Sequence, residues 1–396
     1  MDILPCNILC DQVGVRVETL ERLFRFSSGR AWRGYDPYDA LLSPIARLPL
    51  LRRNRLFKLA FTQLLKRSSV NFRPLLGIRP GVNAKGLALF LSSIARCGSG
   101  EWAIEQISSL ASKLTDSRTL EYPGAGWGYN FPWQGRQFYL SAGTPTVVVT
   151  SFAGGALLDA HAVTGDESHL AIALEACRFV REATHRTTDA TGACLSYSPL
   201  DRSAVYNASL LGARLLVRAG QQARRADLLD SARPLVSYAL ARQRADGSWA
   251  YGEAASQGWV DSFHTGFVLE ALEIFRKATG DPATEKAVRR GSRFYVERLF
   301  GPRGEPYYFP QRHYPYDIHS AAQGVVTLLE LSDLVPGYRE NALLVGRWMV
   351  ENMLGEDGFF HYQIRRTHRV RIPYMRWSQA WGVRALAELA RRGIEL

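Results

Sequence analysis

The sequence of 396 residues has no uninterrupted apolar run of 18 residues, so it predicts no membrane-spanning helix. The first 24 residues lack a basic leader, a long apolar stretch and a small-residue cleavage site, and so do not resemble a signal peptide. Cysteine is scarce, and its spacing matches neither a metal site nor a disulfide framework; the five residues are Cys6, Cys10, Cys97, Cys177 and Cys194. These absences favour a cytoplasmic protein.

Motifs for bound cofactors are also missing. No glycine-rich loop stands between a strand and a helix, which excludes a phosphate cradle for a nucleotide. The sequence holds His264 and His319 near Asp261 and Asp317, but their spacing is not typical of a metal site. We therefore expect no metal and no cofactor.

A repeat is the main feature that is present. An aromatic-rich polar loop followed by a small-residue amphipathic helix recurs about every 56–60 residues, with helix starts near Ser151, Asn207, Ser262, Ile318 and Ser378. A weaker sixth copy lies at residues 85–95. Each first helix is rich in Gly, Ala and Ser, whereas the second carries more Arg and Glu. The pattern predicts an all-α fold, an (α/α)6 toroid of six helical hairpins with the first helices on the inside.

The positive charge is concentrated in the N-terminal part. Residues 1–85 contain 15 Lys/Arg and 6 Asp/Glu, which is +9 of the net +12. We expect residues 1–80 to form a basic N-terminal helical extension packed on a ring domain of residues 81–396. Its amphipathic helix is expected to bury the Leu/Phe face on the ring, with Trp32, Tyr35, Tyr38 and Phe72 as anchors. Contact with an anionic membrane or with polysaccharide machinery is the alternative, and nucleic acid is not an expected partner.

The loops before the inner helices hold much of the Trp and Tyr. In such a ring the inner helices run in the same direction, so these loops meet at one mouth. Exposed aromatics beside Arg, His and Asp are typical of a lined cleft. The candidate substrate-binding residues are Trp127, Tyr129, Trp133, Arg202, Asn207, Trp259, Arg312, Tyr314, Tyr316, His361, Arg376 and Trp377.

Four segments together resemble a known family. RGYDPYDALLSP (33–44), the stretch from NFRPLLGI (71–78) to NAKGLALFL (83–91), VDSFHTGFVLEAL (260–272) and YDIHSAAQGV (316–325) are similar to bacterial α/α-toroid, six-hairpin glycosidase-like proteins of exopolysaccharide and capsule gene clusters. The resemblance covers nearly the whole chain. It implies a role in polysaccharide assembly but assigns no reaction.

A second, weaker resemblance concerns one turn. The segment from Gln243 to Trp249, QRADGSW, is similar to the QW repeat of terpene cyclases and prenyltransferases, which are also toroids. The sequence has no DxDD motif, so isoprenoid cyclisation is a remote alternative. We expect this turn to be structural, with Gln and Trp tying one helix end to the next hairpin.

Candidate catalytic residues begin two neighbouring inner helices. Asp261 and His264 are one repeat away from Asp317 and His319. Two carboxyl groups flanking a bond would suit a glycoside hydrolase, although each Asp is also a good helix N-cap.

The Arg, His and Tyr content favours a different chemistry, that of a uronate epimerase or lyase. Tyr206 and His264 are then the proton-transfer candidates, and Arg202 and Asn207 the partners of the substrate carboxylate. Asp261, Asp317 and His319 support them.

The sequence thus predicts a carbohydrate-active protein of bacterial surface polysaccharide biosynthesis that recognises an anionic, uronate-containing glycan. A hydrolase and a non-catalytic glycan-binding or assembly factor remain the alternatives.

Overall fold

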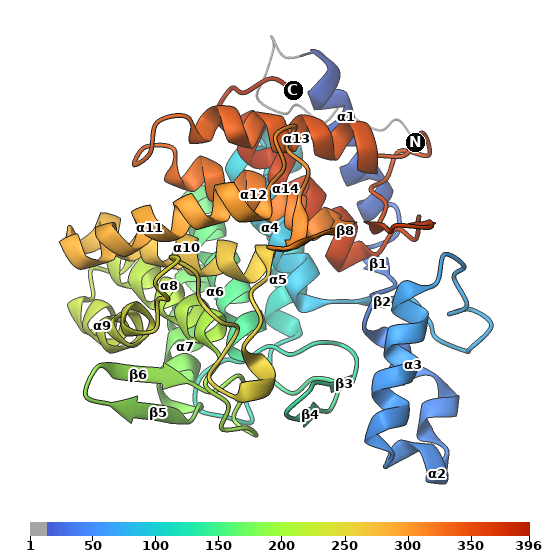
Figure 1. Ribbon diagram of the computed structural model, residues 1–396, viewed down its shortest axis with the longest axis horizontal. Helices are drawn as coiled ribbons and strands as arrows, with labels where there is room; N and C mark the ends of the chain where they lie inside the picture. Colours follow the sequence, from blue (N-terminus) through green and yellow to red (C-terminus); the bar gives the residue numbers. More distant parts are fainter. Residues whose placement is uncertain (1–13) are drawn as a thin grey trace.

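A computed structural model gives the structure of residues 14–396 (Figure 1). Residues 1–13, and with them Cys6 and Cys10, lie outside the described residues. Cys97, Cys177 and Cys194 are buried thiols.

Six helices form a closed inner ring. Each contacts the next around the ring, and the last contacts the first. This arrangement confirms the predicted (α/α)6 toroid and the inner position of the small-residue helices. In order, they are α4 (Ala84–Cys97), α6 (Val147–Thr164), α8 (Tyr206–Gln222), α10 (Ser262–Thr279), α12 (Ile318–Leu331) and α14 (Ala380–Arg391).

An outer helix packs on each of the first five inner helices, following it in the chain. These are α5 (Gly100–Asp116), α7 (Glu167–Glu182), α9 (Ala226–Ala241), α11 (Pro282–Leu299) and α13 (Tyr338–Met353). The last inner helix, α14, packs instead on α1 (Gly14–Ser28), near the other end of the chain (Figure 1). Leu20, Leu23 and Phe24 of α1 belong to the core of the ring. The boundary at residue 80 stays a prediction.

Small residues let the inner helices approach one another. A Cβ at Gly266 of α10 would lie 2.7 Å from Gln323 Cγ and 2.8 Å from Thr327 Oγ1 of α12, so a larger side chain would force the two helices apart. At the other end of α10, Gly280 has φ +66° and accepts the left-handed conformation that ends the helix, as predicted.

Helix α6 is the one helix in the described part of the chain that is long and apolar enough to cross a membrane. Of its 18-residue window, 72% is buried inside the protein. It packs between α4 and α8, so its apolar character is explained by its place in the core.

Short antiparallel strands, which were not predicted, shape the loops. Arg33–Gly34 (β1) pairs with Gly81–Val82 (β2), and one hairpin precedes each of α6, α8, α12 and α14. Their strands are β3 (Trp133–Gln134), β4 (Tyr139–Leu140), β5 (Arg186–Asp189), β6 (Gly192–Leu195), β7 (Tyr307–Phe309), β8 (Arg312–Asp317), β9 (Gln363–Ile364) and β10 (Arg369–Val370). The last four form one sheet in the order β10-β9-β8-β7.

The QRADGSW turn is structural, as expected. The Gln243 side-chain amide donates to the carbonyls of Gly247 and, on α11, Ala287, at 3.0 and 2.9 Å. The Trp249 indole donates to the Ala239 carbonyl at 2.8 Å. The turn thus fixes the end of α9 to the next hairpin.

Residues 35–80 form an arm beside the ring, made of η1 (Asp39–Leu42), η2 (Pro44–Arg47), α2 (Pro49–Arg52) and α3 (Arg55–Arg67) (Figure 1). A small core of Ala40, Leu65 and Ile78 holds it together. Trp32, Tyr35 and Tyr38 pack against the core of the ring, as predicted, but Phe72 is exposed.

The expectation that α3 would bury its apolar face is only partly met. Leu65 is buried, whereas Leu56 and Leu64 are 77% and 69% exposed.

Candidate functional site

Three aromatic rings from alternate inner helices meet inside the ring. The centroids of Phe152 (α6), Phe267 (α10) and Trp381 (α14) are each 5.7 Å apart. The Nζ atom of Lys85, in the first turn of α4, lies 4.2 Å from the Phe152 centroid and 5.0 Å from that of Phe267. This aromatic layer separates the mouth, where the inner helices begin, from the opposite end.

His319, in the first turn of α12, lies on the mouth side of this layer. Its ring stacks 4.3 Å from Trp381 and 4.4 Å from Phe263, and the residue is almost fully buried. Within the described residues neither ring nitrogen has a hydrogen-bond partner. Burial, and then the charges of Lys85 and Arg376, lower its pKa well below the usual value. The imidazole is therefore neutral near pH 7, and the hydrogen-bonding capacity of its two buried nitrogens is unused by the described residues.

His264 belongs to the same place but has a carboxylate partner. Asp261 caps α10 by accepting from the His264 backbone N–H at 3.0 Å, and its other oxygen lies 2.7 Å from His264 Nδ1. This contact makes Nδ1 the protonated nitrogen and leaves Nε2 as the basic one. The His264 ring is 4.2 Å from Phe263, the residue against which His319 stacks, so the two histidines share one site.

Two cations lie close by. No ion pair of the Lys85 amine is found among residues 14–396, and burial, followed by Arg376 and Arg214, lowers its pKa well below the usual value. Arg376 forms two hydrogen bonds with Asp36 of the arm, at 2.6 and 2.8 Å, and its guanidinium is 5.1 Å from the ring centres of Tyr129 and Trp377. A bound anion would stabilise the charged form of Lys85, so the mouth favours a ligand with negative charge.

Tyrosines line the mouth as well. Tyr251 stacks on Trp259 at 4.5 Å and contacts the His264 ring at 4.7 Å. The hydroxyls of Tyr129 and Tyr197 are 3.4 Å apart. Tyr308 contacts Phe263 at 5.6 Å. Their faces and hydroxyls suit a sugar, which has apolar C–H faces and a polar edge.

Asp317 has a positioning role. It accepts from the His319 backbone N–H, the Gln363 amide and the Trp377 indole at 2.9, 2.5 and 2.9 Å, and it has no exposed surface. These three hydrogen bonds occupy both of its carboxylate oxygens. The two aspartates that the hydrolase hypothesis pairs therefore do not face a common bond as free groups.

The structure brings together nine of the predicted residues at the mouth and places the others elsewhere. The nine are Tyr129, Asn207, Trp259, Asp261, His264, Asp317, His319, Arg376 and Trp377. Asn207 is buried at the start of α8, and its side-chain N–H group has no partner among the described residues. Trp133 lies at the rim, 5.5 Å from Tyr197, and Arg202 is exposed.

The remaining predicted residues lie away from this cluster, because each packs on or beside another part of the protein or is exposed. Trp127 is fully buried and donates to the Leu114 carbonyl of α5. Tyr206 packs towards α9, with its ring 6.4 Å from Tyr238. Tyr316 packs on Trp348 of α13 and Tyr314 on Tyr316. Arg312 is exposed on β8, and His361 lies beside Asp357 and Phe359, at the end of α13.

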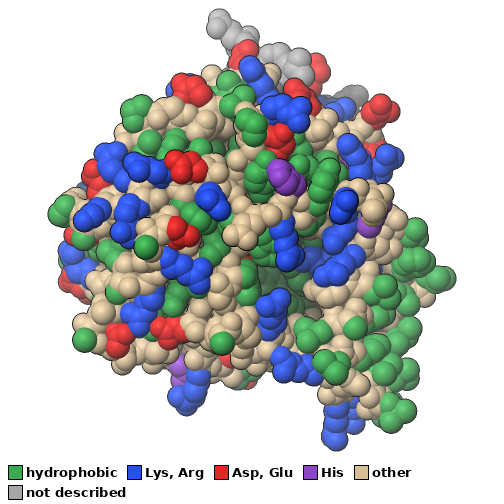
Figure 2. Space-filling model, in the orientation of Figure 1, with side chains coloured by type: hydrophobic (Ala, Val, Ile, Leu, Met, Phe, Trp, Pro, Cys, Tyr) green, Lys and Arg blue, Asp and Glu red, His purple; other side chains and the backbone are tan. Residues whose placement is uncertain are grey.

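Sequence reasoning missed Lys85, Asp36 and Lys66, and the mouth tyrosines other than Tyr129, which are Tyr197, Tyr251 and Tyr308. Lys66 of α3 lies 2.5 Å from the Tyr38 hydroxyl, and the Tyr38 ring is 5.4 Å from Trp377. One signal for Lys85 was its place in AKGLALFL, where a lysine interrupts an otherwise apolar first turn. Figure 2 shows a hollow between the arm and the ring, with Lys and Arg side chains around it.

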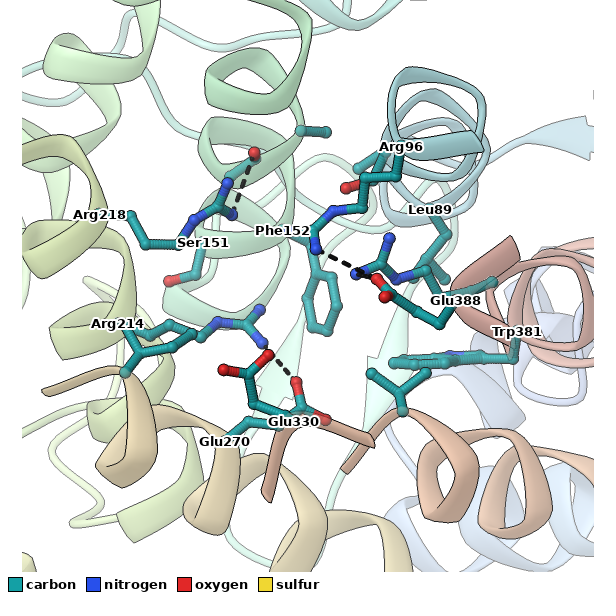
Figure 3. A pocket seen from close by; sticks show the side chains of 17 residues that line it. Leu89, Arg96, Ser151, Phe152, Arg214, Arg218, Glu270, Glu330, Trp381 and Glu388 are labelled. Carbon is teal, nitrogen blue, oxygen red and sulfur yellow. Dashed lines mark hydrogen bonds and ion pairs between the residues drawn. The ribbon is translucent and has the colours of Figure 1, made fainter. Parts of the chain in front are cut away.

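A second cavity lies on the other side of the aromatic layer, towards the C-terminal ends of the inner helices (Figure 3). Its arginines alternate with carboxylates: Arg214 pairs with Glu270 at 3.0 Å, and Arg96 with Glu388 at 3.1 Å. Arg96 and Arg218 also pair with Asp159, at 3.1 and 2.7 Å. Because these charges are matched, we interpret them as a network that joins α4, α6, α8, α10 and α14.

The unpaired lysine leads to a prediction. Lys85→Met should raise stability by about 1–3 kcal/mol, because a buried amine that forms no ion pair with residues 14–396 is replaced by an apolar side chain of similar length. The same change should abolish binding of an anionic ligand. Urea unfolding and calorimetry on one preparation measure both effects. A variant that is less stable than the parent would contradict this description of Lys85, and Lys113→Met on α5 is the exposed control.

Three solved structures with a similar fold are carbohydrate enzymes by their names. A sugar epimerase from a ruminal bacterium matches with TM-score 0.62 at 12% identity, over 80% of this chain and 89% of its own. The cellobiose 2-epimerase of Bacillus thermoamylovorans matches with TM-score 0.61 at 10% identity, over 78% and 88%. An unsaturated glucuronyl hydrolase specific for heparin matches with TM-score 0.58 at 14% identity, over 82% and 91%. No protein-family model and no curated protein matches the sequence. At these identities the likeness establishes the fold.

Proposed function

We propose that this protein is a carbohydrate-active enzyme that transfers a proton at the carbon next to a sugar carboxylate, as a uronate epimerase or lyase. The observation that carries the proposal is that His264 and His319 meet on Phe263 at one mouth, beside Lys85 and Arg376. The likeness in fold to two sugar epimerases and a glucuronyl hydrolase supports it.

His264 is the proposed base. Its Nε2 takes the proton from the sugar carbon, and the Asp261 carboxylate, 2.7 Å from Nδ1, stabilises the imidazolium that forms. The electron pair of the broken C–H bond moves into the substrate carboxylate. Lys85 and Arg376 then stabilise the developing negative charge.

His319 is the proposed second proton-transfer group. The nearby charges of Lys85 and Arg376 help to hold it neutral without a ligand, and a bound carboxylate offsets these charges. His319 then carries a proton to the opposite face of the carbon in an epimerase. In a lyase it delivers the proton to the leaving oxygen as the carbon–oxygen bond at the next carbon breaks. Tyr206 has no part in this scheme because its ring packs towards α9.

A hydrolase that uses paired aspartates is less favoured, because both oxygens of Asp317 are occupied by hydrogen bonds from the His319 backbone, Gln363 and Trp377. A cyclase for isoprenoids needs an apolar cavity, whereas this mouth holds two cations and two histidines. We further propose that the glycan belongs to bacterial surface polysaccharide biosynthesis and that the enzyme works in the cytoplasm; both rest on the sequence.

Solvent isotope exchange tests the reaction. Uronate-containing oligosaccharides are incubated with the enzyme in D2O and examined by NMR and mass spectrometry. Deuterium at an inverted carbon identifies an epimerase, and a new carbon–carbon double bond identifies a lyase. New reducing ends without deuterium would favour the hydrolase. Tight binding without any exchange or cleavage would overturn the proposal in favour of a non-catalytic glycan-binding factor.

A further inference from the structure

The arm exposes a series of large apolar side chains. Eight such residues between positions 45 and 75 are exposed, more than half of the exposed large hydrophobic residues in the described part of the chain. Leu50 is 90% exposed and Leu56 is 77% exposed. Contiguous patches of exposed apolar side chains are uncommon on the surface of a monomeric protein. They are Ile45, Leu48, Leu50, Leu56, Leu64, Val70, Phe72 and Leu75. Figure 2 shows apolar side chains gathered over the arm.

The same segment is strongly basic. Residues 44–80 contain nine Lys/Arg and no Asp/Glu. Lys66 and Arg73 are buried, Arg73 with the Asp39 carboxylate at 2.6 Å, but Arg47, Arg52, Arg53, Arg55, Arg67 and Arg79 are exposed. None of these six arginines forms an ion pair with residues 14–396, and exposed leucines with arginines between them are the pattern of an interfacial amphipathic segment.

We propose that this face of the arm binds the surface of an anionic lipid bilayer. The leucines enter the boundary between headgroups and acyl chains, and the arginines contact the lipid phosphates. Charge complementarity favours this occupant, because a segment without a single carboxylate attracts an anionic surface along its whole length. A second copy of the arm carries the same charge and would be repelled.

The arm is joined rigidly to the mouth, which gives the docking a functional consequence. Asp36 of the arm accepts two hydrogen bonds from Arg376, at 2.6 and 2.8 Å, and the Tyr38 ring of the arm lies 5.4 Å from Trp377. On its other sides the arm is held by a hydrogen bond from Arg55 to the Arg136 carbonyl and by one of 2.9 Å between His368 and the Arg67 carbonyl. A bilayer bound to the arm therefore lies beside the mouth. If the proposed function holds, the substrate glycan is presented there at the membrane surface.

Vesicle flotation tests the inference. The full chain is mixed with vesicles of phosphatidylcholine alone or with 30% phosphatidylglycerol, a fraction of about 30% giving a strongly negative surface. We expect the protein to float with the anionic vesicles and not with the neutral ones.

Two sets of variants examine the two parts of the face. Leu56→Ser/Leu64→Ser should weaken binding to anionic vesicles at least tenfold, because two leucine side chains no longer insert into the bilayer. Arg47→Gln/Arg52→Gln/Arg53→Gln should weaken it about fivefold per arginine and reduce its dependence on salt. The matched control is Leu120→Ser/Val163→Ser, which changes exposed apolar residues outside the arm. Circular dichroism checks that each variant is folded.

The outcomes are distinguishable from those for the proposed function. The leucine variant should keep full activity on a soluble oligosaccharide, because neither residue touches the mouth. Absence of flotation, or flotation that both sets leave unchanged, would overturn the inference. Binding that depends on the arginines alone would also overturn it, because insertion of the leucines is part of the proposal.

Discussion

His264→Gln is expected to lower the rate of substrate deuterium exchange by roughly 10²–10⁴-fold, the range for removal of a general base. Glutamine can keep a hydrogen bond to Asp261, so the cap of α10 and the fold should be retained. His319→Gln should have an effect of similar size, since the second proton-transfer group is lost. Exchange followed by NMR at saturating substrate separates this loss of rate from weaker binding.

The matched control for both is His361→Gln. His361 was also a candidate from the sequence, but it lies beside Asp357, away from the aromatic layer, and should be replaceable with little effect on exchange. If His361→Gln abolished exchange while His264→Gln did not, the site would have been placed wrongly.

Glu388→Gln is expected to reduce the free energy of unfolding by about 3–5 kcal/mol, the cost of removing one partner from a buried ion pair. Glu388 of α14 is buried and holds Arg96 of α4 at 3.1 Å, Arg384 at 2.7 Å and Arg391 at 3.0 Å. Without its charge, Arg96 and Arg384 remain in a cluster of positive groups. Thermal unfolding measures the loss, and Glu297→Gln, on the exposed side of α11, is the control.

The same carboxylate makes stability depend on pH. Burial alone would raise the pKa of Glu388, but Arg384, Arg96 and Arg391 lower it to about 2. Since the folded-state pKa is below the ordinary value of 4.5, its contribution is complete above pH 4.5 and is lost as the pH falls towards 2. The parent protein should therefore lose stability in this range, and Glu388→Gln should lose less. Equal slopes for both proteins would contradict this assignment.

The hairpins were predictable because each is local in sequence. A small-residue helix, a turn such as the one at Gly280, and a second helix repeat often enough to define the ring without any long-range information. The sixth outer helix was not predictable in this way. Its role falls to α1, which joins α14 across almost the whole chain, and no repeat pattern reveals such a contact.

Whether a predicted residue lies in the site depended more on its position along the repeat than on its residue type. Asp261, His264 and His319 begin inner helices, and the structure brings them together with Arg376 and Trp377. Trp127 is aromatic like Trp377, but its indole N–H donates to a backbone carbonyl inside the core and does not face the mouth. Lys85 was not predicted as a site residue, because an isolated lysine normally faces water. Its burial is seen only in the folded structure, where the amine packs on the rings of the aromatic layer.

Ring closure has a consequence for synthesis of the chain. The pairs Arg96–Glu388 and Asp36–Arg376 join residues 292 and 340 positions apart. A ribosome adding about 5–20 residues per second needs roughly 17–70 s to make 340 residues. During that interval α4 and the arm have no partner from the last hairpin. The leucines of the arm and the open flank of α4 are then exposed together, so the nascent chain should depend on a chaperone until α14 emerges.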